Sequence, residues 1–352
     1  MNYIVSKGNV KKKKGISSIV LLSLVFVSFL ILTSCNQCNK KRTEKVDVSE
    51  VPEINVKIKR YEKALFSINP NNLKAELKPL VKDYGIFLGG ANLNDSVKLL
   101  DMKEYLTAPQ IQEAYHAIIK EFPDVSDLEK QFSSAFKYFK HYYPEKKIPT
   151  IYTYVSGYAY EFPVQFADSA LIIGLDLYLG KNFKFYKMFQ LPVYKTDKMQ
   201  REFILPDCMK EIAYKQIDGA KVENTFIDKM VYEGKVIYFI DAMLPEAQDS
   251  LKMGYSSKQM DWCEKNESNV WAFFLEKNIL YSTDPNLYKK FISDAPFTST
   301  FSKQSPGRIG AWIGWQIVQA YMEKNPKVTL AELMKDNDAK KILSKSRYKP
   351  KK

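Results

Sequence analysis

The stretch ALIIGLDLYLG (residues 170–180) is followed along the chain by LPDCMKEIAYKQI (205–217) and MVYEGKVIYFI (230–240). The first is a short apolar run, which is typical of a buried strand. The other two predict consecutive helices, the first beginning near Pro206 and the second carrying Glu233 and Gly234. These three segments predict a sheet strand joined through a loop to a pair of helices.

The flanking sequence predicts an α+β protein, mostly helical with a small β-sheet. Helical periodicity extends from Leu73 to Tyr143, and alternation at 54–58 indicates a half-buried strand. Strand-forming runs follow at 148–155, 162–166 and 169–175, before the chain becomes helical again. Three helix starts are signalled there, by Ser256-x-x-Gln259, Asp284-Pro285 and Thr329-x-x-Glu332. No repeat or Pro/Gly-rich linker divides residues 53–338, so we expect a single domain.

The order strand, helix and second helix with Glu-Gly resembles the scaffold of gluzincin metallopeptidases. In that scaffold the first helix carries H-E-x-x-H, which supplies two zinc ligands and a general base, and the second helix supplies the third ligand. Glu233 fits that third position, but H-E-x-x-H is missing. Asp207 and Glu211 are spaced i,i+4 and could share the face that the histidines would occupy.

Three interpretations of these acidic residues follow. The chain is a degenerate peptidase fold that binds partners without a cofactor, or Asp207, Glu211 and Glu233 form an all-oxygen site for a divalent cation such as calcium. In the third, Asp207 is a helix N-cap and Glu211 is solvated. We predict a non-enzymatic protein, with a metal-dependent, peptidase-like hydrolase using an atypical carboxylate site as the alternative.

Other catalytic signatures are absent from the sequence. The two histidines, His116 and His141, have no metal-ligand spacing, and there is neither a G-x-S-x-G elbow nor a Walker-type glycine loop. Cys208 and Cys263 are either a disulfide or two small buried thiols.

The N-terminus has the three parts of a signal peptide in residues 1–34: lysines, an apolar run at 16–32 and a small-residue exit. Leu32-Thr33-Ser34-Cys35 resembles a bacterial lipobox, so Cys35 is predicted to carry the lipid, including acyl chains such as palmitate. A retained transmembrane anchor is the alternative. Residues 35–52 then form a polar tether. The absence of Asp after Cys35 favours the outer membrane.

The formal net charge of +13 lies mainly at the two ends of the chain. Residues 61–339 contain 34 basic and 36 acidic side chains. Residues 339–352 are predicted to form a basic tail. Because a nucleic-acid-binding domain carries a basic patch on its fold, this distribution argues against nucleic acid as a partner. We expect contact with a membrane through the lipid anchor instead.

The stretch SPGRIGAWIGWQIVQAYM (305–322) resembles the gliding-motility lipoprotein B (GldB) family of Bacteroidetes, as do 56–66, 173–180 and 192–194. The resemblance implies a lipid-anchored outer-membrane protein of the cell envelope that faces the periplasm and serves gliding machinery, with no known reaction. We therefore expect a binding or scaffolding component with protein or glycan partners. Within this stretch, Arg308 precedes a helix and either pairs with a buried carboxylate such as Glu233 or is exposed.

Overall fold

The computed structural model describes residues 46–89, 92–217 and 224–350. The stretch at 170–180 begins with strand β4 (Ala170–Gly174), an inner strand of a four-stranded sheet with the order β1-β2-β4-β3. β1 (Ile58–Arg60) and β2 (Thr150–Tyr154) are parallel to β4, while β3 (Val164–Ala167) is an antiparallel edge strand. The expected small sheet is therefore present. β1 begins only at Ile58, the last residue of the alternating 54–58 pattern.

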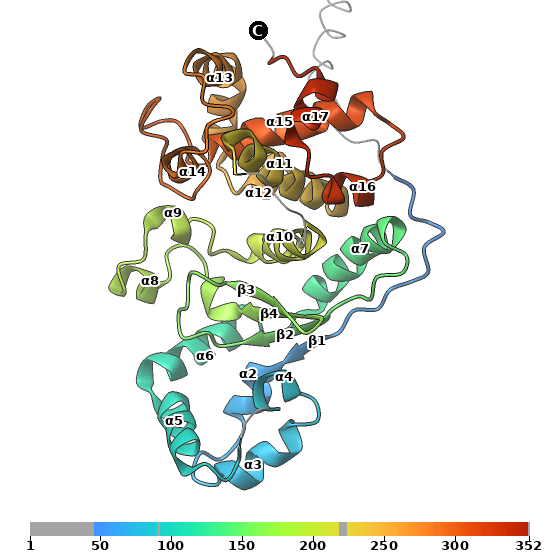
Figure 1. Cartoon of the computed structure of the whole chain (residues 1–352). Coiled ribbons are helices and arrows are strands. Elements are labelled where there is room, and N and C mark those ends of the chain that lie inside the picture. The colour runs from blue at the N-terminus through green and yellow to red at the C-terminus, as the bar shows by residue number, and fades with distance from the viewer. Residues whose placement is uncertain (1–45, 90–91, 218–223, 351–352) are drawn as a thin grey trace, which may run out of the picture. The chain divides into compact units, whose positions relative to one another are not determined.

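Helices lie between β1 and β2 in the chain and again after the last strand, β4 (Figure 1). Between β1 and β2 come α2 (Tyr61–Phe66), α3 (Leu73–Leu80), α4 (Gly85–Leu88), α5 (Ser96–Thr107), α6 (Pro109–Glu121) and α7 (Ser126–Tyr142). After β4 come α8 (Lys184–Met188), α9 (Val193–Thr196), α10 (Ile204–Ile217), α11 (Phe226–Met243), α12 (Asp249–Met253), α13 (Ser257–Glu276), α14 (Pro285–Phe291), α15 (Ile309–Lys324), α16 (Leu330–Lys335) and α17 (Ala339–Ser346), with short 3₁₀ turns at Leu175–Leu177 and Arg201–Phe203. The predicted α+β class with a helical majority is confirmed.

The helix starts read from local sequence patterns are present as expected. Ser256 with Gln259 and Thr329 with Glu332 form reciprocal capping boxes at α13 and α16, and Asp284 caps α14 ahead of Pro285. These side chains accept hydrogen bonds from backbone N–H groups that have no partner within the helix, which explains why the helices begin there.

Helices α11 and α15 cross at unusually short range through Gly234 and Gly314. A Cβ atom on Gly314 would lie 1.7 Å from the carbonyl oxygen of Met230, and one on Gly234 would lie 2.3 Å from the Gly314 backbone. Only glycine permits this approach. The Glu-Gly pair in α11 and the Trp-Ile-Gly-Trp run in α15 are therefore the two halves of one helix crossing, with Trp312 and Trp315 fully buried around it.

The structure adds detail that the sequence patterns did not give. The described residues from 46 onward belong to one compact unit, spanning 45–352, which contains the main core and a smaller cluster beneath α2–α5. Residues 339–346, expected within a basic tail, form α17, which packs on α15 because Ala339 and Ile342 are buried. Cys208 and Cys263 are free, buried thiols rather than a disulfide.

Two of the expectations concern parts of the chain beyond this description. The signal peptide and the lipidation residue Cys35 lie outside the described residues. Among the helices that the structure does describe, none has both the length and the apolar character needed to cross a bilayer.

Candidate functional site

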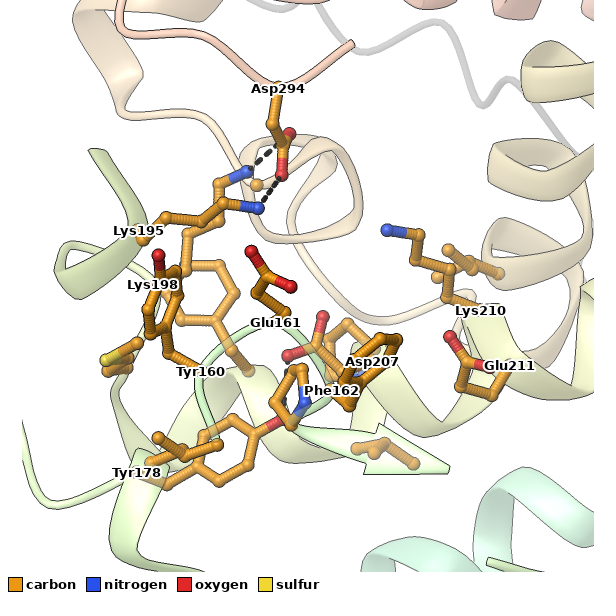
Figure 2. Close-up of a pocket in the computed structure, with 18 of the residues that line it drawn as sticks. Tyr160, Glu161, Phe162, Tyr178, Lys195, Lys198, Asp207, Lys210, Glu211 and Asp294 are labelled. Carbon is orange, nitrogen blue, oxygen red and sulfur yellow. Dashed lines mark hydrogen bonds and ion pairs between the residues drawn. The ribbon is translucent and has the colours of Figure 1, made fainter. Parts of the chain in front are cut away.

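A cavity of about 520 Å³ opens beside the helix predicted from residues 205–217 (Figure 2). Helix α10 packs between edge strand β3 and helix α11, and its outward face lines the cavity. Segment 160–166 forms a second wall, residues 251–254 a third, and Asp294 and Arg308 close the far side. A second open cavity of about 840 Å³ adjoins it and shares Lys198, Asp294 and Arg308.

Asp207, Lys210 and Glu211 share the cavity face of α10 because they are spaced i, i+3 and i+4. Asp207 lies inside the first turn of a helix that begins at Ile204, so its interpretation as an N-cap was wrong. Its carboxylate instead accepts a hydrogen bond of 2.8 Å from the Tyr178 hydroxyl. Burial raises the pKa of both carboxyl groups, so Glu211 is not the fully solvated residue of that interpretation either.

Three cations converge on Asp294 at the far side of the cavity. Its carboxylate lies 2.7 Å from Lys195 Nζ and 3.3 Å from Lys198 Nζ, and Arg308 Nε is 3.7 Å away. Burial alone would raise the pKa of Asp294, but Lys198, Arg308 and Lys195 outweigh it and hold that pKa well below its usual range. Burial in turn lowers the pKa of Lys198 to about 8, although Asp294 opposes the drop.

Arg308 also pairs with Glu233, the first of the two arrangements expected for it. Arg308 Nη2 lies 2.9 Å from Glu233 Oε2, and the two side chains are only 12% and 8% exposed. The Tyr214 hydroxyl donates a longer hydrogen bond, 3.5 Å, to the other oxygen of Glu233. Arg308 adopts a left-handed conformation at the start of α15, with φ of 58°. A non-glycine residue keeps such a backbone only where its surroundings hold it in place, and the Arg308 side chain is bound here to both Glu233 and Asp294.

The three acidic residues proposed as cation ligands are not assembled into one site. Asp207 is bonded to Tyr178, whereas Glu233 is bonded to Arg308 and Tyr214. Within 46–89, 92–217 and 224–350, no group of three His, Cys, Asp or Glu side chains is placed to hold a metal ion. The divalent-cation site predicted from spacing therefore has no counterpart in the described geometry.

His116 and His141 are exposed on α6 and α7, and neither lines the cavity. Sequence reasoning missed the cationic cluster around Asp294 because Lys195 and Lys198 lie 99 and 96 residues from it along the chain. It also missed Asp176, a fully buried carboxylate that accepts hydrogen bonds from the Ser156 and Tyr158 backbone N–H groups. An acidic residue inside the apolar 170–180 run was the available signal, since a buried carboxylate needs such donors.

Comparisons with known proteins place the chain in a family without adding a structural precedent. No curated protein and no solved structure gave a match. One family model does match, over residues 41–350, which is most of the sequence and includes every residue of the cavity. The chain belongs to the family described as gliding motility protein GldB.

Proposed function

We propose that this protein is a non-enzymatic binding component of the cell-envelope machinery that serves gliding motility. Membership of the GldB family supports a gliding-motility lipoprotein associated with the envelope. We further propose that a lipid on Cys35 anchors it to the outer membrane and that its partners are envelope proteins or glycans, with no resident cofactor.

The observation that carries the non-enzymatic role is the ion pair between Arg308 and Glu233. A catalytic zinc site has three protein ligands and an open position for water. Here the guanidinium of Arg308, rather than a metal ion, neutralises the carboxylate that the gluzincin-like interpretation would use as the third ligand. An arginine stays protonated throughout the physiological pH range, so this charge is permanent.

The contacts of α10 support a different alignment with the H-E-x-x-H motif from the one expected. Lys210-Glu211-x-x-Tyr214 has the same spacing, with Lys210 and Tyr214 where the two histidines would stand. Tyr214, four residues after Lys210, is the residue whose hydroxyl reaches Glu233. We therefore interpret the site as a peptidase-like scaffold. Lys210 and Tyr214 replace the two histidine ligands, and Arg308 supplies the positive charge that the metal ion would provide.

The cavity fits a binding role because charges of both signs line it and aromatic side chains stand at its edge. Lys210 and Glu211 line the cavity from α10, while Glu161 projects into it from segment 160–166 (Figure 2). Phe162 is 61% exposed beside Glu161. Exposed aromatic side chains bordered by polar groups are characteristic of recognition surfaces.

Crosslinking of the protein in intact cells, followed by purification from membranes, tests this proposal. Lys210→Glu reverses a charge in the cavity and should abolish recovery of the specific partner, whereas Lys265→Glu, an exposed position on α13, should leave it unchanged. Equal recovery in both variants, or recovery of lipoprotein-sorting factors alone, would contradict the binding role.

The anchor is tested separately by Cys35→Ala. This variant should lack lipid by mass spectrometry and be missing from the outer-membrane fraction, because the thiol that takes the lipid is absent. An unchanged distribution between membrane fractions would refute the assignment of Cys35.

A further inference from the structure

Helices α8 and α9 form a projection at the side of the fold, here called the knob and defined as residues 181–196 (Figure 1). Three apolar side chains at its tip face solvent: Met188 is 60% exposed, Phe189 42% and Val193 73%. They lie within six consecutive residues, at the end of α8 and the start of α9, and are here called the apolar tip. Exposed apolar side chains gathered in one segment are a feature of interaction sites.

Hydrogen bonds and aromatic contacts attach the knob to the domain, so its apolar tip is held in one position. Tyr186 is buried, and its hydroxyl donates to the Asp176 carbonyl at 2.7 Å and accepts from the Leu179 N–H at 3.1 Å. The Phe189 ring lies 5.0 Å from that of Tyr158 and 5.7 Å from that of Phe185. Backbone hydrogen bonds close the turn after α8, including one of 2.9 Å from the Leu191 N–H to the Tyr186 carbonyl.

The charged side chains of the knob itself are all basic. Residues 181–196 include four lysines and no acidic residue. Lys195 is bound to Asp294 inside the cavity, and Lys184 forms an ion pair with Glu113. Lys181 and Lys187 are exposed and precede the apolar residues in the same segment. Apolar tips between lysines are complementary to a bilayer surface, where the side chains enter the acyl boundary and the lysines meet anionic headgroups.

We propose that the knob is a second membrane contact, which inserts Met188, Phe189 and Val193 into a bilayer bearing anionic lipids. This inference rests on the proposed lipid anchor for the presence of a membrane nearby. The chain between Cys35 and Val46, where the described domain begins, spans at most about 40 Å when extended, so the anchor keeps the domain close to the bilayer that holds it. Contact at both points would fix which face of the domain is turned to the membrane.

The test places an environment-sensitive fluorophore on the knob of the mature lipidated protein, reconstituted into vesicles. Val193→Cys carries the label, and Val97→Cys, 65% exposed on α5, is the matched control. Both are made in a Cys38→Ser background, so that the dye does not label Cys38. The native thiols of Cys208 and Cys263 can stay because they are buried. The vesicles contain phosphatidylcholine alone or with phosphatidylglycerol, and brominated acyl chains report insertion by quenching.

We expect blue-shifted, quenched emission from the Val193 label only when phosphatidylglycerol is present, and water-like emission from the Val97 label throughout. Removing both charges with Lys181→Gln and Lys187→Gln should lower the ratio of inserted to free knob about 30-fold, since each lysine near an anionic surface contributes roughly fivefold. Emission from Val193 as water-like as that from Val97 in anionic vesicles would overturn the proposal. A blue shift of the Val193 label in native membranes but not in lipid vesicles would also overturn the proposal and point to a protein partner. Failure of the proposed lipid anchor would be seen separately, as a protein that does not incorporate into vesicles at all.

Discussion

Replacing Gly314 by alanine should break the closest contact between the two central helices. The new Cβ would lie 1.7 Å from the Met230 carbonyl oxygen and 2.5 Å from its carbon, both backbone atoms that no side-chain rotation can move. A carbon and an oxygen approach to about 3.3 Å at closest. Helices α11 and α15 would therefore have to separate by about 1.6 Å at this point.

The structure allows the size of this effect to be worked out. Alanine is a better helix former than glycine by about 1 kcal/mol, which acts in favour of the variant. Overpacking of a core typically costs about 1–3 kcal/mol and can exceed this range, and a gap of 0.5–1 Å already forfeits about a quarter to a half of a dispersion contact. Because the clash is between backbones and the flanking Trp312 and Trp315 are fully buried, we expect a gross cost of about 3 kcal/mol or more, which leaves a net loss of at least about 2 kcal/mol.

Urea unfolding and thermal unfolding of the purified mature protein, both followed by far-ultraviolet circular dichroism, measure this loss. Gly85→Ala is the control, since a Cβ at Gly85 in α4 meets nothing within 4 Å. The melting temperature of Gly314→Ala should fall by at least about 4 °C, given about 2–4 °C per kcal/mol for a large domain. If both variants unfold at the same urea concentration as the wild type, the helix crossing is looser than described and the reasoning fails.

Three further predictions concern the charges around the cavity. Arg308→Gln should destabilise the fold by about 3–5 kcal/mol by leaving Glu233 as an unpaired buried charge; the double variant with Glu233→Gln should recover part of this, and strict additivity in thermal unfolding would argue against the pair. Asp294→Asn should destabilise at pH 7, but less at low pH: the folded pKa of Asp294 lies below its unfolded value of 3.8, so its stabilisation is present above that value and lost as the pH falls. A gap between variant and wild type that stays constant from pH 6 to 2 in urea titrations would contradict this. The pKa of Lys198 is about 8 in the folded protein and 10.5 in the unfolded chain. The folded state is therefore favoured by this group above pH 10.5, and that advantage is lost as the pH falls towards 8. Wild-type stability should therefore rise relative to Lys198→Gln between pH 8 and 10.5, by less than about 3 kcal/mol, and parallel unfolding curves across that range would exclude it.

The features of the fold that were predicted correctly depend on residues close together in sequence. The capping residues Ser256, Asp284 and Thr329 act on backbone groups two or three positions away, so the sequence pattern and the structure contain the same information. The crossing at Gly234 and Gly314 joins residues 80 positions apart. The sequence showed two glycines in apolar helices but not that they would face each other.

The candidate site shows the same limit more sharply. The pairing of Arg308 with Glu233 was one of two expected arrangements, and choosing between them required knowing whether α15 begins beside α11. On α10, the pairs 207/211 and 210/214 both have i,i+4 spacing, so periodicity alone could not select the second. Contact between Tyr214 and Glu233 selects it, and that contact depends on how α10 is rotated against its neighbour.

The burial of Arg308 at the start of α15 has a consequence for how the protein withstands its surroundings. A side chain supplies the cation opposite Glu233, so chelators cannot strip it and competing ions cannot displace it. The charge that faces Glu233 is consequently independent of the supply of metal ions. We expect chelator treatment to leave the thermal stability of the domain unchanged, because this ion pair needs no metal ion.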